Sequence, residues 1–383
     1  MRVFLFIPLF FTSSLFCTTQ GFCQPAELVS YKGFTNKQIL EDRADLILKN
    51  GDVGLTRDQL IEAFHFIESK EKHGKNSYTF HDTHLPCEIE LSKPLHSYII
   101  RKIRGGAAHI GSGCHKDVAK AILYGEHPRV IAECLSDDSA RKEIHVLQKT
   151  KGAKGIVPYL GSQKRGDKYS IFLEYFPQGT LMHHLNNDPP LSETQLLKIA
   201  LDLSVGLQAL HAKKLVHRDL HAANVLLNIS PNLCEAVLAD FGKTCTLKEA
   251  KKITPQAPRS KNPPEVLLKS FASIDRLRVD VYALGCLFYQ MIWRKNVAWG
   301  SLFDIYNLDK YNKAMRKKIY AHIVELYNRA KVRRLAPILQ KQRDGQPLTH
   351  MESFQLLIFK MIGYKVKERP YINEVATTLE GLQ

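Results

Sequence analysis

The feature that most constrains this chain is a run of polar residues set between two apolar stretches near its centre. Val216–Leu227 reads VHRDLHAANVLL and places Asp219 five residues before Asn224. The triplet Asp-Phe-Gly begins at Asp240, sixteen residues after Asn224. Phosphoryl transfer needs a carboxylate beside the acceptor hydroxyl and two oxygen ligands that hold Mg²⁺ against the phosphates. Asp219 fits the first need, and Asn224 and Asp240 fit the second.

A glycine-containing turn lies about a hundred residues earlier. Ile110–Val118 reads IGSGCHKDV and has strand-like residues on both sides. Because glycine has no Cβ, a turn containing Gly111 and Gly113 can bring its backbone close to phosphates. Gly-x-Gly is common in turns, so this pattern gains its weight from the two motifs that follow it in the chain.

These motifs, taken in order, resemble those of a eukaryotic-type protein kinase domain, from about residue 97 to residue 383. Further landmarks match the family in sequence order: Glu143 in a helical run, Glu265 at the end of Pro-Pro-Glu, Asp280 before an apolar helix, and Arg369, which pairs with the segment-closing glutamate in the family. The resemblance implies an α+β, two-lobed kinase fold with a small β-rich N-lobe and a large helical C-lobe. It also implies that the chain binds ATP and Mg²⁺.

The resemblance further implies a role for each matching residue. Asp219 and Arg218 of the central loop are expected to be catalytic, with Asp219 orienting the acceptor hydroxyl. Asn224 and Asp240 are expected to hold the metal ion. The positions expected to line the nucleotide are Ile110, Gly111, Gly113, Val118, Ile131, Leu173, Glu174, Phe176 and Leu226.

The chain departs from the family at the strand that should carry a lysine. Arg129–Leu135 reads RVIAECL, and the family pattern Val-Ala-Ile-Lys places Glu133 at the lysine position. A carboxylate there would repel both phosphate and Glu143. One explanation is a displaced lysine, similar to the with-no-lysine kinases, in which Lys116 reaches the same pocket and Glu133 pairs with Lys116 or Lys120. The other is a pseudokinase that acts as a nucleotide-binding or partner-binding scaffold. The intact acceptor and metal positions favour the displaced lysine.

The acceptor is less well defined by the sequence. His221 stands where many Ser/Thr kinases carry lysine, and a protonated histidine could supply part of that role at lower pH. We expect transfer of the ATP γ-phosphate to Ser or Thr of a protein substrate, with Tyr left open. A small-molecule phosphotransferase is a less favoured alternative, because Glu265 and Arg369 belong to the peptide-binding part of protein kinases.

The N-terminus is typical of an exported protein. Met1-Arg2 precedes the apolar stretch Val3–Cys17, which as a helix would rise about 22 Å, short of the roughly 30 Å hydrocarbon core of a bilayer. The basic start, the apolar core and the small residues of Thr19–Gly21 resemble a signal peptide, with a short membrane anchor as the alternative. We therefore expect a signal-like segment at 1–21 and a secreted or exported protein, with delivery into another cell as an extension of that hypothesis.

The residues between this segment and the kinase-like domain are predicted to form a helical extension over 22–96. Thr35–Gln38 and Thr56–Gln59 have the pattern of capping boxes, and each precedes apolar residues at helical spacing. This predicts a helical hairpin that packs on its neighbour. His81, His84 and Cys87 have a spacing that can hold zinc, but no fourth ligand is evident nearby, and a metal is not expected there.

The net charge of +16 is unevenly distributed along the chain. Residues 1–96 hold 10 basic and 12 acidic residues, whereas 292–350 alone hold 13 basic and 4 acidic residues. Tyr311–Arg334 has a helical pattern in which many of these basic residues occur. ATP binding does not need this excess, so it indicates a docking surface for an acidic partner or a membrane surface, with a solvated helix face as the alternative. No zinc finger or aromatic-interleaved basic motif is present, and nucleic acid is not an expected partner.

Overall fold

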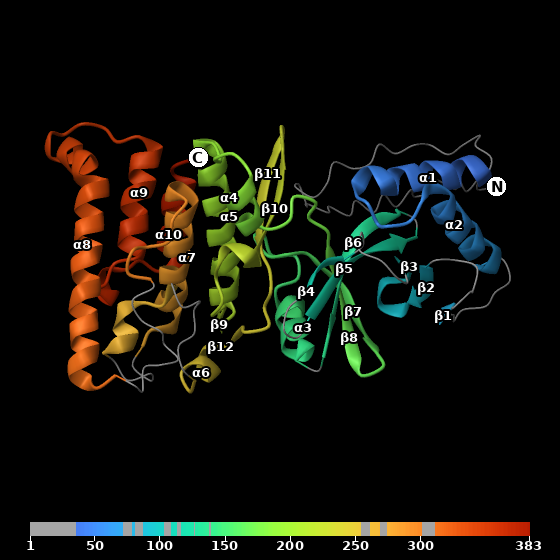
Figure 1. The fold of residues 1–383 in the computed structure, drawn as a ribbon, viewed down its shortest axis with the longest axis horizontal. Coiled ribbons are helices and arrows are strands. Elements are labelled where there is room, and N and C mark those ends of the chain that lie inside the picture. The colour runs from blue at the N-terminus through green and yellow to red at the C-terminus, as the bar shows by residue number, and fades with distance from the viewer. Residues whose placement is uncertain are drawn as a thin grey trace, which may run out of the picture.

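The computed structural model describes residues 36–71, 79–80, 87–102, 109–112, 116–125, 127–137, 139–253, 261–268, 274–300 and 311–383. The signal-like segment, Gly113, and His81 with His84 lie outside the described residues. Figure 1 shows a sheet flanked by helices at one end of the molecule and a mainly helical part at the other. This arrangement agrees with the two-lobed architecture that the sequence predicted. No helix among the described residues has both the length and the apolar character needed to cross a bilayer.

The N-terminal lobe is built on one antiparallel sheet. Its strand order is β1-β2-β3-β5-β6-β8-β7, and β4 also pairs with β5. The strands are β1 (Thr79–Phe80), β2 (Cys87–Ser92), β3 (Ser97–Lys102), β4 (His109–Ser112), β5 (Lys116–Tyr124), β6 (Arg129–Ser136), β7 (Tyr159–Arg165) and β8 (Lys168–Glu174). A short 3-10 helix, η1 (Lys93–Leu95), connects β2 to β3.

The sheet curls until its two edges meet. Gln163 of β7, the last strand in the order, donates a hydrogen bond of 2.9 Å to Glu90 of β2, which lies next to the short end strand β1. Gly161 of β7 lies so close to Leu95 that an added Cβ would be 2.7 Å from the leucine side chain. One face of the curled sheet therefore points inward, and Ile99, Ala121, Ile131 and Phe172 fill it.

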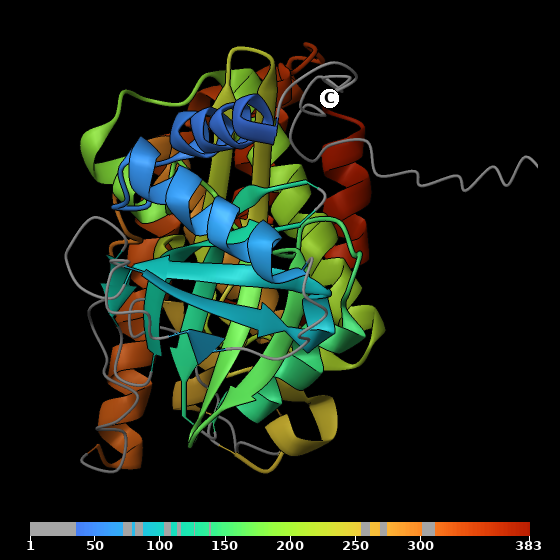
Figure 2. The same ribbon diagram turned by 90° about the vertical axis from the view of Figure 1, so that its right-hand side faces the viewer.

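Two helices, α1 (Asn36–Asn50) and α2 (Arg57–Glu71), lie against the other face of the sheet (Figure 2). Their apolar residues share one buried cluster with β2, β3, β5 and β6, in which Phe64 stacks on Tyr124 with ring centroids 4.4 Å apart. The sequence predicted a helical extension over 22–96, but the structure shows that this part of the chain also contains strands. Cys87–Ser92 pairs with β3 along its whole length, so the sheet begins before residue 97.

The C-terminal lobe is mainly helical. Its elements are α4 (Leu181–Asn187), α5 (Glu193–Ala212), β9 (Leu215–Val216), η3 (Ala222–Asn224), β10 (Val225–Ser230), β11 (Leu233–Leu238), β12 (Cys245–Thr246), α6 (Leu247–Ala250), η5 (Pro264–Leu267), α7 (Arg276–Trp293), α8 (Lys313–Arg343), α9 (His350–Met361), η8 (Val366–Glu368) and α10 (Ile372–Glu380). The helix α3 (Ala140–Lys149) belongs to the N-terminal lobe, where it packs on β7 and β8.

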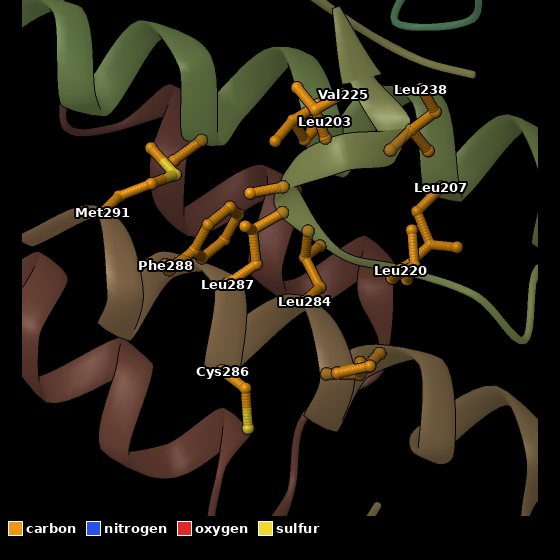
Figure 3. Packing of buried hydrophobic residues seen from close by; sticks show 14 of the residues in the cluster. Leu203, Leu207, Leu220, Val225, Leu238, Leu284, Cys286, Leu287, Phe288 and Met291 are labelled. Carbon is orange, nitrogen blue, oxygen red and sulfur yellow. The ribbon is translucent and has the colours of Figure 1, made fainter. Parts of the chain in front are cut away.

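The core of this lobe is built around α7, which is apolar on nearly every side and therefore buried. Leu284, Leu287 and Phe288 of α7 pack toward α5 and the start of β10 (Figure 3). On the opposite side, Gly285 lets α9 approach closely, since an added Cβ would lie 2.7 Å from Met361. This rigid base supports the loop that follows β9.

Candidate active site

Hydrogen bonds to a residue of α7 hold the loop after β9 in place. The buried carboxylate of Asp280 accepts hydrogen bonds from the backbone N–H of His217, at 2.8 Å, and of Arg218, at 3.0 Å. Arg218 has a positive φ of 70°, a conformation that L-residues rarely adopt. The two bonds to Asp280 stabilise this turn, which immediately precedes Asp219.

Asp219 is surrounded by donors. Lys243 places its Nζ 3.0 Å from Oδ2 of Asp219, and Nε2 of His221 lies 3.7 Å from the same oxygen. Asn224 donates through Nδ2 to the Asp219 carbonyl at 3.0 Å and to its Oδ2 at 3.3 Å. Burial alone would raise the pKa of Asp219, but the nearby His221 and Lys243 side chains outweigh it and lower the pKa to about 2. Asp219 is therefore a carboxylate at neutral pH.

The Asp-Phe-Gly triplet follows β11 and turns inward. Phe241 is fully buried, and its ring centroid lies 5.4 Å from that of His217. Its backbone N–H donates to Oε1 of Glu143 at 3.2 Å, which ties the triplet to α3. Asp240 has a positive φ of 55°, and this turn directs its carboxylate toward β5.

Lys116 joins these parts from the first position of β5. Its Nζ lies 2.6 Å from Oε2 of Glu143 and 2.6 Å from Oδ1 of Asp240. Burial alone would lower the pKa of Lys116, but the two carboxylates outweigh it and raise the pKa above its usual value. In the family pattern the partner of Glu143 would be a lysine on β6. Here the ammonium group of Lys116 on β5 forms this ion pair with Glu143 of α3.

The strand register corrects the position of the missing lysine. Lys116 of β5 lies opposite Ser136, and Val118 lies opposite Cys134, so Cys134 shares the face of Lys116. Glu133 lies opposite Ala119, on the inward face of the curled sheet. Because side chains alternate along a strand, a shift of one residue moves a position to the other face. Cys134, and not Glu133, therefore holds the lysine position, and burial raises the pKa of its thiol to about 12.

Glu133 pairs with neither lysine that the sequence suggested. Both of its carboxylate oxygens accept hydrogen bonds from Arg101 of β3, the Nη2 bond being 3.0 Å long. Arg101 also donates to Glu90 at 2.7 Å. Lys120 instead donates to the backbone carbonyl of Asp52, at 2.5 Å. The Glu133 carboxylate is neutralised on the far side of the sheet and does not face Glu143.

The expected nucleotide-lining residues fall into several groups. Val118, Leu173, Phe176 and Leu226 belong to one apolar cluster with Ala132 and Cys134. Ile110 is exposed on β4, and Gly111 of that strand pairs with Val118. The carboxylate of Glu174 lies 3.8 Å from the guanidinium of Arg129. Because the side chain pairs with Arg129, the backbone of Glu174 is the part of this residue that can line the pocket.

Ile131 is a correction. It is fully buried on the inward face of the sheet with Ile99, Ala121 and Phe172. Ala132, which lies opposite Leu173, occupies the pocket face where Ile131 was expected. The alternation in RVIAECL permits either assignment, because apolar residues occupy both faces of this strand. A doubly buried strand therefore gives no signal in the sequence that could have separated the two.

The family landmark at the end of the segment is confirmed. Arg369, which is almost fully buried, donates from Nη1 and Nη2 to the two carboxylate oxygens of Glu265 at 2.9 and 3.2 Å. It also donates to the carbonyls of Arg278 at 3.0 Å and of Gly363 at 2.8 Å. This bidentate pair anchors the stretch after residue 261 to the base of the lobe.

Lys243 was not among the site residues that the sequence predicted. It was visible only as one of several basic residues after the Asp-Phe-Gly triplet. The signal in the sequence was His221 at a position where many Ser/Thr kinases carry lysine, because a lysine elsewhere could then supply the positive charge.

The residues at the metal positions have suitable chemistry for Mg²⁺. Asp240 offers carboxylate oxygens, and Asn224 uses its Nδ2 as a donor to Asp219, which leaves its amide oxygen as the acceptor. Hard divalent cations prefer such oxygen ligands. The two residues therefore fit the ion that the fold implies.

Comparison with known proteins agrees with this geometry. A family model described as protein kinase domain matches residues 104–378. The serine/threonine/tyrosine-protein kinase HT1 of Arabidopsis thaliana is 31% identical over 201 residues, which cover 51% of this chain and 50% of that protein. The mitogen-activated protein kinase kinase kinase ANP1 of Arabidopsis thaliana is 30% identical over 202 residues, 50% of this chain and 29% of that protein.

A yeast relative gives the same result. The serine/threonine-protein kinase STE11 of Saccharomyces cerevisiae is 29% identical over 164 residues, which cover 42% of this chain and 22% of that protein. The chain spans half or less of the length of these curated relatives. The match of the family model over most of the chain, together with the two-lobed fold, identifies the chain as a member of the protein kinase family.

Proposed function

We propose that this protein transfers the γ-phosphate of ATP to Ser or Thr hydroxyls of proteins, with Lys116 in place of the missing strand lysine. The observation that carries the proposal is the position of the Lys116 Nζ, 2.6 Å from both Glu143 and Asp240. In protein kinases, a lysine paired with a glutamate at the position of Glu143 contacts the phosphates of ATP. Lys116 has the charge and the partner that this role requires.

The remaining residues supply positioning and charge. Asn224 and Asp240 would hold Mg²⁺, which neutralises phosphate charge when bound. The acceptor oxygen attacks the γ-phosphorus, the bond from that phosphorus to the bridging oxygen breaks, and ADP leaves with the bonding electron pair. Asp219 accepts a hydrogen bond from the acceptor hydroxyl and takes its proton. Its lowered pKa of about 2 keeps it ionised and able to do so throughout the neutral range.

The alternative is a pseudokinase that acts as a scaffold. Three contacts favour an active enzyme: Phe241 packs on His217, its N–H bonds to Glu143, and Asp280 fixes the loop before Asp219. The bond to Glu143 joins the Asp-Phe-Gly triplet to α3, and the other two contacts hold the triplet and the loop before Asp219 in place. A domain that only held a partner would not need its acid, amide and ammonium groups to meet there.

The choice of Ser or Thr as acceptor rests on relatives and on the peptide-binding part. ANP1 and STE11 are named as a kinase kinase kinase and a serine/threonine kinase, whereas HT1 is named for tyrosine as well. The Glu265–Arg369 pair belongs to the part of the fold that supports a peptide, which favours a protein over a small molecule as the substrate.

The proposal is tested by γ-phosphate transfer from labelled ATP to a generic protein substrate. We expect Lys116→Met and Asp219→Asn to lower kcat by about 100-fold or more, because each removes a charge from the site. Lys120→Met is a matched control, since Lys120 lies on the same face of β5 but bonds to Asp52. Full activity in Lys116→Met would exclude the displaced lysine. Nucleotide binding without transfer by the wild type would favour the scaffold.

We further propose that the exposed basic side of α8 docks an acidic protein. Lys318, Arg333 and Arg343 are exposed on this helix, and Tyr327 and Leu335 hold its other side in the core. Charge reversal of the three basic residues should weaken binding to an acidic polypeptide such as polyglutamate. Equal binding by the reversed variant, or binding to anionic vesicles alone, would contradict the proposal.

Export is proposed from the signal-like N-terminus. It creates a question about where ATP is met, which delivery into another cell would answer. Fractionation of the producing cells tests this proposal. Protein found only in their own cytoplasm would contradict it.

A further inference from the structure

A positive charge lies beside Asp219 although the central loop lacks the usual lysine. In many Ser/Thr kinases that lysine stands two residues after the aspartate, and here His221 occupies the position. The Nζ of Lys243 lies 3.0 Å from Oδ2 of Asp219, closer than the Nε2 of His221 at 3.7 Å. The ammonium thus comes from the residue that follows the Asp-Phe-Gly triplet.

Hydrogen bonds hold the backbone at Lys243 and at the residue that follows it. Arg218 donates from Nη1 to the carbonyl of Lys243 at 3.1 Å. The next residue, Thr244, is buried, with its N–H bonded to the carbonyl of Phe241 at 3.0 Å. The Lys243 side chain nevertheless remains 52% exposed. A fixed backbone with a half-exposed ammonium can present its charge to a ligand that arrives beside Asp219.

We infer that Lys243 is a catalytic residue that takes the place of the lysine missing from position 221. This inference rests on the proposed kinase function. The ammonium contacts an oxygen of the transferred phosphoryl group and offsets the negative charge there, while it holds Asp219 toward the acceptor. Lys243 gives up no proton. The hydroxyl proton still goes to Asp219, and ADP leaves as described above.

Two other roles for this lysine lead to different results. If His221 neutralised the phosphate, loss of Lys243 would leave transfer unchanged. If Lys243 blocked the acceptor site by pairing with Asp219, its loss would increase transfer. Arg218 acts through the Lys243 carbonyl and is by this geometry a positioning residue for the same charge.

The experiment compares kcat and the KM for protein substrate in three variants of the full chain. Lys243→Met should lower kcat by about 100-fold, the size expected for one charged donor at the reacting oxygen, with a smaller change in KM. Lys243→Arg and the double variant Lys243→Met/His221→Lys should each recover at least part of that loss. Lys248→Met, an exposed lysine in the same segment, is the control and should behave as wild type.

Each outcome decides the role of Lys243. An unchanged or increased kcat in Lys243→Met would overturn the inference, and so would a loss that neither Lys243→Arg nor the double variant recovers. ATP binding by each variant, measured in parallel, shows that the site is folded. Failure of the proposed function is distinguishable, since then the wild type itself would bind ATP and transfer no phosphate.

Discussion

At the scale of single residues, the ion pair with Glu143 is formed by a lysine of β5 and not by a residue of β6. Lys116 and Cys134 lie on the same face of neighbouring strands, and Lys116 extends to Glu143, where a lysine at Cys134 would ordinarily point. Glu133 is excluded from this exchange because it lies on the other face and is bound by Arg101. The ammonium group that pairs with Glu143 therefore comes from β5 and not from β6.

This arrangement makes a rescue experiment possible. We expect the double variant Lys116→Met/Cys134→Lys to recover at least about tenfold of the activity lost in Lys116→Met, because a lysine at 134 faces Glu143 and can restore one ion pair. Lys116→Met/Glu133→Lys is the matched control and should recover nothing, since position 133 faces Arg101. Phosphate transfer is the measurement. Rescue by the 133 variant in place of the 134 variant would contradict the register.

The residues of the site were predictable where a motif fixes both type and spacing. Asp219, Asn224 and Asp240 follow from such motifs, and the structure brings Asp219 and Asn224 into contact. Lys116 was predictable as a candidate, and its contact with Asp240 required the fold. Cys134, Ala132 and Lys243 were not predictable in this way. Their roles depend on which face a strand presents and on where a turn ends, which residue order alone leaves open.

At the scale of elements, the hairpin of β10 and β11 contains a carboxyl group in an unfavourable place. Burial, reinforced by the nearby carboxylate of Asp202 on α5, raises the pKa of Glu235 to about 7. Asp202 in turn accepts a hydrogen bond of 3.2 Å from the N–H of Ala236. Both acids lie where α5 packs on β11, so the charge state of Glu235 affects how firmly the hairpin is held.

The sign of the resulting pH dependence follows from the raised pKa. A carboxyl group whose pKa is higher in the folded state contributes stability that is complete below its unfolded value and lost as the pH rises through about 7. Glu235→Gln removes this term. We expect the Tm difference between the variant and the wild type to increase in favour of the variant by about 2 °C from pH 5 to pH 8. This corresponds to roughly 1 kcal/mol after discounting for solvent screening.

Thermal unfolding at the two pH values, with Glu380→Gln at an exposed position as the control, measures this gain. A gain at pH 5 that equals the gain at pH 8 would show that Glu235 does not titrate in this range.

Elements with strong local signals were predictable, and those fixed by distant contacts were not. The capping pattern at Thr56 predicted α2, and its hydrogen bonds are present. The helical pattern of Tyr311–Arg334 predicted most of α8, which the structure extends to Arg343. The strand β2 was missed, because its six residues gain stability from pairing with β3 and not from their own propensity.

At the scale of the whole molecule, the helices α1 and α2 share one hydrophobic core with the sheet of the N-terminal lobe. The apolar faces of α1 and α2 share a core with β3, β5 and β6. The loop between the two helices also reaches the segment that joins the lobes. Lys120 of β5 bonds to the carbonyl of Asp52, and an added Cβ at Gly51 would lie 3.3 Å from the ring of Tyr175. The extension therefore supports the strands that carry Lys116.

A single substitution in α2 tests whether the helices and the sheet unfold as one. Phe64 is fully buried and stacks on Tyr124, so Phe64→Ala should cost about 3–5 kcal/mol of unfolding free energy. If the extension and the sheet share one cooperative core, the transition that ATP and Mg²⁺ shift upward should itself move to lower temperature. His65→Ala, at the exposed neighbouring position, should leave that transition in place. Calorimetry that instead shows a separate early transition, with the nucleotide-dependent one unmoved, would mean that the helices fold independently of the kinase lobe.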